Sequence, residues 1–166
     1  MPLTLILTRH AKSDWDDPAL SDHDRPLNAR GRRDAPRVGA WLAGSGYRPG
    51  EALVSSARRT QETWERLAPA LDRAPALRTL PGLYHAGAAD ILQQLRGATV
   101  PTVIVIGHNP GIGEFAHRIV DTPAAHPRFI DYPTCATLVA DFAADGWDRV
   151  DWRSGRCLDF VVPRDL

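Results

Sequence analysis

The segment Leu3-Thr4-Leu5-Ile6-Leu7-Thr8 is a short apolar run, rich in branched side chains, that leads directly into Arg9 and His10. A second run of this kind, Thr102 to Ile106 (TVIVI), leads into Gly107 and His108. Short continuous apolar runs are typical of strands that are buried on both faces. A shorter run, Ala52 to Val54, lies between them. The sequence therefore predicts three strands of one buried sheet.

Helical patterns fill the intervals between these strands, and we expect helices at about 35–43, 58–71, 88–95 and 111–119. Strands that alternate with helices predict an α/β fold, a three-layer α/β/α arrangement with a mostly parallel central sheet. Pro36 either begins the first long helix or kinks it. Beyond Thr134 the pattern changes to strands joined by glycine-containing turns, so antiparallel members are expected at the C-terminal end, at 134–142, 149–152 and 157–162.

Length and composition predict a single domain over residues 1–166, since the chain is 43% hydrophobic and too short for two ordinary domains. Twenty Lys and Arg residues balance twenty Asp and Glu residues, which argues against nucleic acid or a membrane as partner. The first strand follows Met1 and Pro2 directly and no run reaches membrane-spanning length, so we expect a cytoplasmic protein. Cys135 and Cys157 lack metal-binding spacing and are expected to be buried thiols.

Each of the three predicted strands is followed by a loop that carries histidine or arginine residues. His10 and His108 follow the first and last, and the segment Ser55-Ser56-Ala57-Arg58-Arg59 places arginines at the start of a helix. Ligands of open α/β sheets bind at the carboxyl ends of the strands. Helix N-termini and arginine side chains bind oxyanions, and burying arginines beside imidazoles is costly without an anion. We therefore predict a phosphoryl-binding site that needs no metal or other cofactor.

Four separated motifs carry a resemblance to the histidine-phosphatase (phosphoglycerate-mutase-like) superfamily, and within it to the short SixA-type phosphohistidine phosphatases. They occur in the family's order over about residues 3–120, and they are Thr8-Arg9-His10-Ala11, Arg25-Pro26-Leu27-Asn28 with Gly31, Ser55-Ser56-Ala57-Arg58-Arg59 with Thr63, and Gly107-His108-Asn109-Pro110. The first motif is RHG in the family, so Ala11 is a departure.

The resemblance implies roles for individual residues. His10 is the expected nucleophile, which becomes transiently phosphorylated, and Arg9 binds phosphate. The family pattern of serine, three residues, arginine, three residues and threonine selects Arg59 over Arg58, because Ser55 and Thr63 then fall into register. His108 is expected to contact the phosphoryl group, and Asn109 is included among the phosphate-binding residues.

The sequence does not identify the general acid that protonates the leaving group. Larger relatives supply a glutamate from a segment that here reads Leu83-Tyr84-His85-Ala86-Gly87, which makes His85 the candidate. His85 could instead cap the helix region at 90–95 or lie on the surface, and Asp14 and Asp16 are alternatives. Because the imidazole of phosphohistidine leaves far more readily than an alkoxide, the missing glutamate favours a phosphoramidate or another activated phosphate.

The leading hypothesis is thus a phosphatase that acts on protein phosphohistidine through a phosphohistidine intermediate. One alternative is the same machinery acting on a small phosphorylated metabolite, and another is a phosphate-binding relative that never turns over. Lys12, Ser13 and Asp16 are left without assigned roles. We interpret the segment 22–25 as a solvated loop that borders the cleft, rather than as a metal site. We expect core or partly buried positions for four tryptophans, Trp41, Trp64, Trp147 and Trp152.

Overall fold

The computed structural model describes residues 2–166, which form a six-stranded sheet in the order β3-β2-β4-β1-β5-β6. The four strands β3, β2, β4 and β1 are parallel, whereas β5 is antiparallel to both β1 and β6. The predicted fold class, with its antiparallel C-terminal part, is therefore confirmed. The strands are β1 (Leu3–Arg9), β2 (Glu51–Ser55), β3 (Ala76–Leu80), β4 (Thr102–Gly107), β5 (Thr137–Phe142) and β6 (Arg156–Val161).

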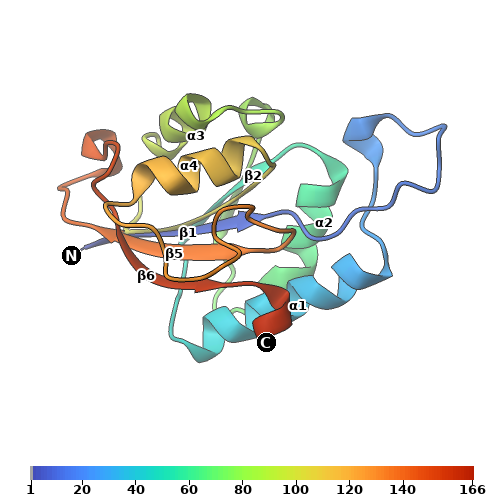
Figure 1. Cartoon of the computed structure of the whole chain (residues 1–166), viewed down its shortest axis with the longest axis horizontal. Helices are drawn as coiled ribbons and strands as arrows, with labels where there is room; N and C mark the ends of the chain where they lie inside the picture. The colour runs from blue at the N-terminus through green and yellow to red at the C-terminus, as the bar shows by residue number, and fades with distance from the viewer. Residues whose placement is uncertain (1) are drawn as a thin grey trace.

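Two pairs of helices cover the two faces of the sheet (Figure 1). Helices α1 (Ala29–Gly44) and α2 (Arg58–Leu67) pack together on one face, and α3 (Ala88–Leu95) and α4 (Gly111–Ile119) pack together on the other. Short 3-10 turns connect these elements at Asp22–Asp24, Ala68–Ala70, Pro81–Leu83, Trp147–Arg149 and Pro163–Asp165.

Strand β1 contributes to the core on both faces because successive side chains of a strand point in opposite directions. Leu5 and Leu7 belong to the core that includes Phe115 of α4, while Ile6 belongs to the core that includes Val38 of α1. These side chains are fully buried. Each such burial contributes about 1.5–3 kcal/mol, so the sheet is a firm frame for the loops at its ends.

The predicted helices exist, but two of their bounds were wrong. Helix α1 begins at Ala29 because the Asn28 side chain accepts a hydrogen bond from the backbone N–H of Gly31 at 2.9 Å and so caps the first turn. Pro36 consequently lies inside α1 and does not begin it. Helix α2 ends at Leu67, just before the 3-10 turn that contains Pro69.

The strand predictions had three errors. Strand β3 was missed because it lies at the edge of the sheet with mostly exposed side chains, and so lacks an apolar pattern. The strand expected at 149–152 does not form, since Trp147–Arg149 is a 3-10 turn whose Trp147 indole donates to the Val100 carbonyl at 2.7 Å. Strand β5 begins only at Thr137, because Cys135 has a positive φ of 63° that is incompatible with a strand.

The thiols and indoles largely lie where the sequence placed them. Cys135 is buried and Cys157 is partly buried, and both are free. Trp64 and Trp147 are in the core, while Trp41 and Trp152 pack against it. No helix within residues 2–166 combines the length and the apolar character needed to cross a membrane.

Candidate active site

The three loops named by the sequence meet at one end of the sheet. The parallel register pairs Arg9 at the end of β1 with Gly107 at the end of β4, so His10 and His108 follow neighbouring strands. The backbone N–H of Cys135, just before β5, donates to the carbonyls of Arg9 and His10 and closes this end. A pocket of about 260 Å³ results, lined by Arg9, His10, Lys12, Ser13, Trp15, Asp22, Arg25, Arg59, His85, His108, Asn109 and Thr134.

His10 is buried, with 7% of its surface exposed, and its imidazole has a defined tautomer. The Nδ1 atom lies 2.7 Å from the carbonyl oxygen of Ala11, which can only accept a hydrogen bond, so Nδ1 carries the proton. Burial, supported by the nearby His108 and arginines, holds the pKa of His10 well below its usual value. At neutral pH His10 is therefore uncharged, and its Nε2 atom keeps a lone pair.

The loop that carries His10 is tied to α2 by backbone contacts. The N–H of Ala11 donates to Oγ1 of Thr63 at 3.0 Å, and this hydroxyl donates to the carbonyl of Arg59 at 2.6 Å. Helix α1 approaches the same loop so closely that a Cβ on Gly31 would lie 2.2 Å from the carbonyl oxygen of Lys12. Thr63 and Gly31 of the sequence motifs thus serve to position the loop.

His108 lies beside His10, with 5.3 Å between the ring centroids. Its Nε2 atom is 2.7 Å from Oγ of Ser55, and its Nδ1 atom is buried without a protein partner among the described residues. Burial, together with the charge of Arg59, lowers the pKa of His108 to about 3. The second imidazole is therefore also neutral, with one ring nitrogen left for a ligand.

The two arginines at the start of α2 have different environments. Arg59 is buried and donates to the backbone carbonyl of Asp22 at 2.7 Å and to its carboxylate at 3.1 Å. Arg58 is exposed on the helix surface and pairs with Glu62 at 3.2 Å. The structure therefore places Arg59 in the pocket and Arg58 outside it.

Three buried nitrogens around this pocket have no hydrogen-bond partner within the described residues: Nε of Arg9, Nε of Arg59 and Nδ1 of His108. A buried polar group left unpaired costs about 1–3 kcal/mol. Four cationic side chains line the pocket against a single carboxylate, that of Asp22, and they are Arg9, Lys12, Arg25 and Arg59. Unpaired donors and excess positive charge together indicate a site for an anion with several oxygens.

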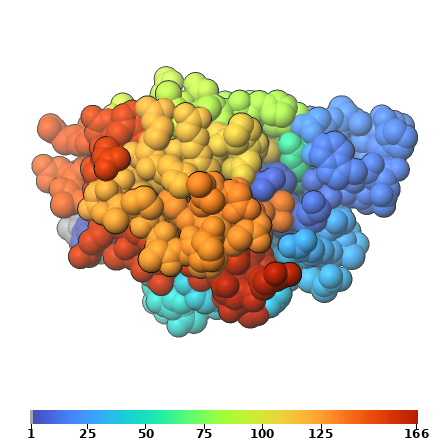
Figure 2. Space-filling model, viewed as in Figure 1, coloured from blue at the N-terminus to red at the C-terminus, as the bar shows by residue number. Residues whose placement is uncertain are grey.

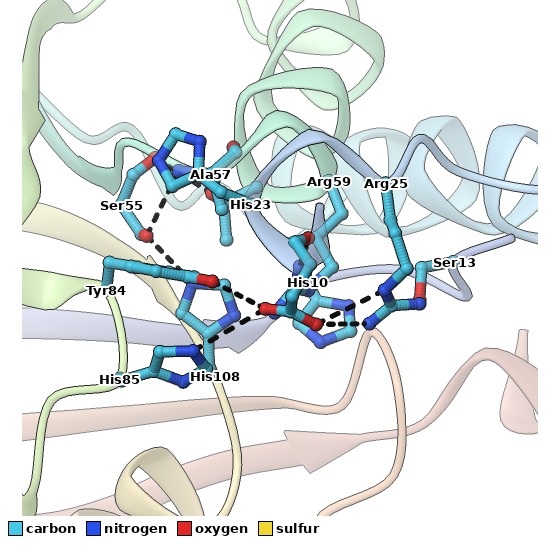
Figure 3. A network of polar contacts seen from close by, with 12 residues as sticks. His10, Ser13, His23, Arg25, Ser55, Ala57, Arg59, Tyr84, His85 and His108 are labelled. Carbon is cyan, nitrogen blue, oxygen red and sulfur yellow. Dashed lines mark hydrogen bonds and ion pairs between the residues drawn. The ribbon is translucent and has the colours of Figure 1, made fainter. Parts of the chain in front are cut away.

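The carboxylate of Asp22 lines the pocket and links the arginines Arg25 and Arg59 with Tyr84, three residues that are labelled in Figure 3. It accepts hydrogen bonds from Arg59, from Arg25 at 3.1 Å and from the hydroxyl of Tyr84 at 2.6 Å. Burial alone would raise the pKa of Asp22, but the Tyr84 hydrogen bond and the Arg59 charge outweigh burial and lower it. Asp22 is therefore an anion that shares Arg59 with any bound ligand.

The segment 22–25 does border the pocket, as expected, but it is not a solvated loop throughout. Arg25 is 7% exposed and donates to Oγ of Ser13 at 2.8 Å as well as to Asp22. Within residues 2–166, no group of three or more His, Cys, Asp or Glu side chains is arranged to hold a metal ion.

His85 lies at the outer rim of the pocket. Its side chain is 64% exposed, and its Nε2 atom is 3.5 Å from the Asp22 carboxylate. Its ring stacks near that of Tyr84, at 4.0 Å between centroids. His85 does not cap α3, because Asp90 accepts from the backbone N–H of Gly87 there. The alternative acids Asp14 and Asp16 are not among the residues that line the pocket.

Asn109 lines the pocket but its amide is occupied. The amide nitrogen donates to the carbonyls of Asp131 and Tyr132, both at 3.0 Å, and the amide oxygen accepts from the backbone of Gly113. No amide hydrogen is left for a phosphate oxygen. The side chain of Asn109 therefore holds the loop before α4 against the segment 131–132, and phosphate binding by Asn109 stays a prediction.

Several residues that line the pocket or hold its side chains in place were not identified from the sequence. The Ala11 carbonyl could not be found because any residue offers one. Tyr84 and Ser55 were quoted as parts of motifs without roles, and Trp15 drew no attention. Their importance depends on contacts between loops far apart in the chain, which periodicity does not report.

A buried, uncharged imidazole inside a cationic pocket at the end of an α/β sheet is typical of phosphoryl-transfer enzymes. Residues 5–85 match the histidine phosphatase superfamily (branch 1). A protein of Mycobacterium tuberculosis is 34% identical over 163 residues, which cover 94% of this chain and 99% of that protein. The chain belongs to the histidine phosphatase superfamily, and it is a phosphatase.

Other similar proteins are of the SixA type. The phosphohistidine phosphatase SixA of Escherichia coli is 26% identical, over 93% of this chain and 95% of its own length. The solved structure of a proposed phosphohistidine phosphatase SixA from Nakamurella multipartitia superimposes with a TM-score of 0.84 at 24% identity, covering 98% of this chain and 97% of the other. The second likeness supports the fold over the whole described chain.

Proposed function

We propose that this phosphatase hydrolyses phosphohistidine in proteins through a covalent intermediate on His10. The observation that carries the proposal is a set of three buried nitrogens without a hydrogen-bond partner among residues 2–166, placed around one uncharged imidazole whose Nε2 atom makes no hydrogen bond within the same residues. A module that only bound phosphate would need the donors but not a nucleophilic lone pair, so the arrangement favours turnover over binding.

In the first step Nε2 of His10 attacks phosphorus, the bond to His10 forms, and the bond to the substrate's imidazole breaks. The leaving nitrogen takes the electron pair of that bond and then a proton. The Ala11 carbonyl accepts a hydrogen bond from Nδ1–H of His10. This hydrogen bond stabilises the positive charge that develops on the His10 ring. Water then attacks the phosphorus and loses a proton, phosphate is released, and His10 regains its lone pair.

Arg9, Arg59 and His108 bind the phosphoryl oxygens during both steps. Their unpartnered nitrogens are fixed before the ligand arrives, so little reorganisation is needed as charge develops. Arg59 also has to exchange part of its contact with Asp22 for the phosphoryl group. Charge stabilisation thus comes from side chains of this chain alone.

His85 is our candidate for the acid that protonates a leaving group. It is exposed at the rim, where the leaving group departs, and its Nε2 atom lies 3.5 Å from the Asp22 carboxylate. The imidazole of phosphohistidine needs little protonation, which fits an acid that is only loosely held.

The dimensions of the pocket favour a protein substrate. Pockets that enclose a whole small ligand usually measure about 300–1,000 Å³, whereas this one measures about 260 Å³ and is open at Trp15 and His85. It is large enough for a phosphoryl group, and the exposed Trp15 and His85 lie where the remainder of a protein substrate would emerge. The likeness to SixA over nearly the whole chain supports both this assignment and a single domain over 1–166.

A screen of the purified protein tests the substrate class. We would compare kcat/KM for a phosphohistidine peptide, a set of sugar phosphates and a set of nucleotides, with His10→Ala as the blank. The phosphohistidine peptide should give the highest value. A sugar phosphate or nucleotide that exceeds it would assign the enzyme to a small metabolite instead.

A further inference from the structure

Trp15 is an exposed aromatic side chain at the mouth of the active-site pocket. It is 70% exposed, and it lines the same pocket as His10 and Arg59. It belongs to the segment that follows β1, drawn in blue, which projects at one end of the molecule in Figures 1 and 2. A single exposed aromatic ring is ordinary on a protein surface, but this ring lines the active-site pocket and lies against Arg25.

The ring is held in place by Arg25. The guanidinium carbon of Arg25 lies 3.4 Å from the ring centroid of Trp15, which is a stacked cation–π contact. Arg25 is itself fixed by hydrogen bonds to Ser13 and Asp22. One face of the indole therefore rests on an immobile support, and the high exposure leaves the rest of the ring open to solvent and to substrate.

From its position at the rim, Trp15 would contact the leaving group of the substrate rather than the phosphoryl group. The cationic interior of the pocket takes the phosphoryl group, and the small volume forces the remainder of the substrate past the rim. A planar leaving group that emerges there meets the open part of the indole. Imidazole is planar and aromatic, and an imidazolium is also attracted to the electron-rich face of an indole.

We propose that Trp15 is a specificity residue that stacks on the planar leaving group of the substrate and so selects phosphohistidine over phosphoryl groups on flexible chains. This inference rests on the proposed function for its substrate class, but the stacking can be tested without it. The opposing explanation is that Trp15 only shields Arg25 from solvent, in which case it would affect all substrates equally.

The test compares Trp15→Ala with the wild type on two peptides of the same sequence, one carrying phosphohistidine and the other phospholysine. We expect kcat/KM to fall about 3- to 10-fold on phosphohistidine and less than about 2-fold on phospholysine, a size that corresponds to one aromatic stacking contact. Trp15→Phe should retain most of the selectivity. Ile130→Ala is the matched control, because Ile130 is 79% exposed but does not line the pocket.

Two inhibitors separate this inference from the proposed function. Phenylphosphonate carries a planar group and methylphosphonate does not, and the inhibition constants of both are measured without their being turned over. Trp15→Ala should weaken the binding of phenylphosphonate and leave the binding of methylphosphonate unchanged. If Trp15→Ala reduced kcat/KM equally for the two peptides and the affinity equally for the two phosphonates, Trp15 would act through Arg25. If none of these values changed, Trp15 would make no contact with the substrate. Either result would overturn the inference. A wild type that prefers sugar phosphates, yet shows the phosphonate effect, would refute the proposed substrate and leave the stacking intact.

Discussion

The two halves of the pocket are built in different ways. The inner half, Arg9, His10, Arg59 and His108, comes from strand ends and a helix start, and its polar atoms are buried or partly buried and held by backbone carbonyls and Ser55. The outer half, Trp15, Asp22, Tyr84 and His85, comes from connecting segments and is much more exposed. Phosphoryl transfer is thus preorganised, whereas leaving-group chemistry lies in parts of the chain that the core does not constrain.

The largest effect is expected in the inner half. Arg59→Ala should reduce kcat/KM by about a thousandfold on every substrate, because one fixed donor to the phosphoryl oxygens is lost. Steady-state kinetics on an aryl phosphate would measure it. Arg58→Ala is the neighbouring control, exposed and paired with Glu62, and it should stay within about twofold of the wild type. A greater loss for Arg58→Ala would place the wrong arginine in the mechanism.

In the outer half the effect should depend on the leaving group. His85→Ala should slow hydrolysis of an alkyl phosphate by about a hundredfold, because an alkoxide needs a proton, while an aryl phosphate or phosphohistidine should be almost unaffected. Parallel kinetics on the three substrates would measure this contrast. A uniform loss would assign His85 to phosphate binding or to folding, and no loss at all would leave protonation to water.

Residues of the inner half should also make the fold sensitive to acid. The folded state holds His108 neutral with a pKa of about 3, while the unfolded chain takes up a proton below about 6.5. The free energy of unfolding should therefore fall with decreasing pH between these values, by up to about 1.4 kcal/mol per pH unit from this group. Urea denaturation at several pH values would show a shallower decline for His108→Gln. Identical slopes for both proteins would refute this assignment.

The smallest effect concerns the boundary between the halves. Asp22→Asn removes the carboxylate that shares Arg59 with the ligand, so inorganic phosphate should inhibit about 3- to 10-fold more tightly. Asp24→Asn, at an exposed neighbouring position whose carboxylate pairs with His23, should leave the inhibition constant unchanged. Weaker inhibition of Asp22→Asn would show that Asp22 positions Arg59 rather than competing for it.

The same contrast explains what the sequence could predict. The inner half follows from local patterns, since apolar strands place His10 and His108 at their carboxyl ends and the spacing of Ser55, Arg59 and Thr63 selects the arginine. The parallel order of β1, β2 and β4 follows from alternating strands and helices.

Only parts of the outer half could be predicted from the sequence, namely His85 as a candidate acid and the segment 22–25 as a border of the cleft. The contacts of Asp22, Tyr84 and Trp15 arise where the connection between β1 and α1 folds on itself and meets the connection between β3 and α3, and no period in the sequence records such a meeting. The edge strand β3 was also missed. Its side chains are mostly exposed, so its sequence does not show the apolar run that identifies a buried strand.

The central claim is that His10 carries the phosphoryl group during turnover. The direct measurement is mass spectrometry of the protein after mixing with an aryl phosphate and quenching in alkali, because phosphohistidine is labile in acid. The account predicts one phosphoryl group on the peptide that contains His10, formed within the first turnover and absent from His10→Ala. Full activity without any phosphorylated His10, or phosphorylation of His108 instead, would contradict the account.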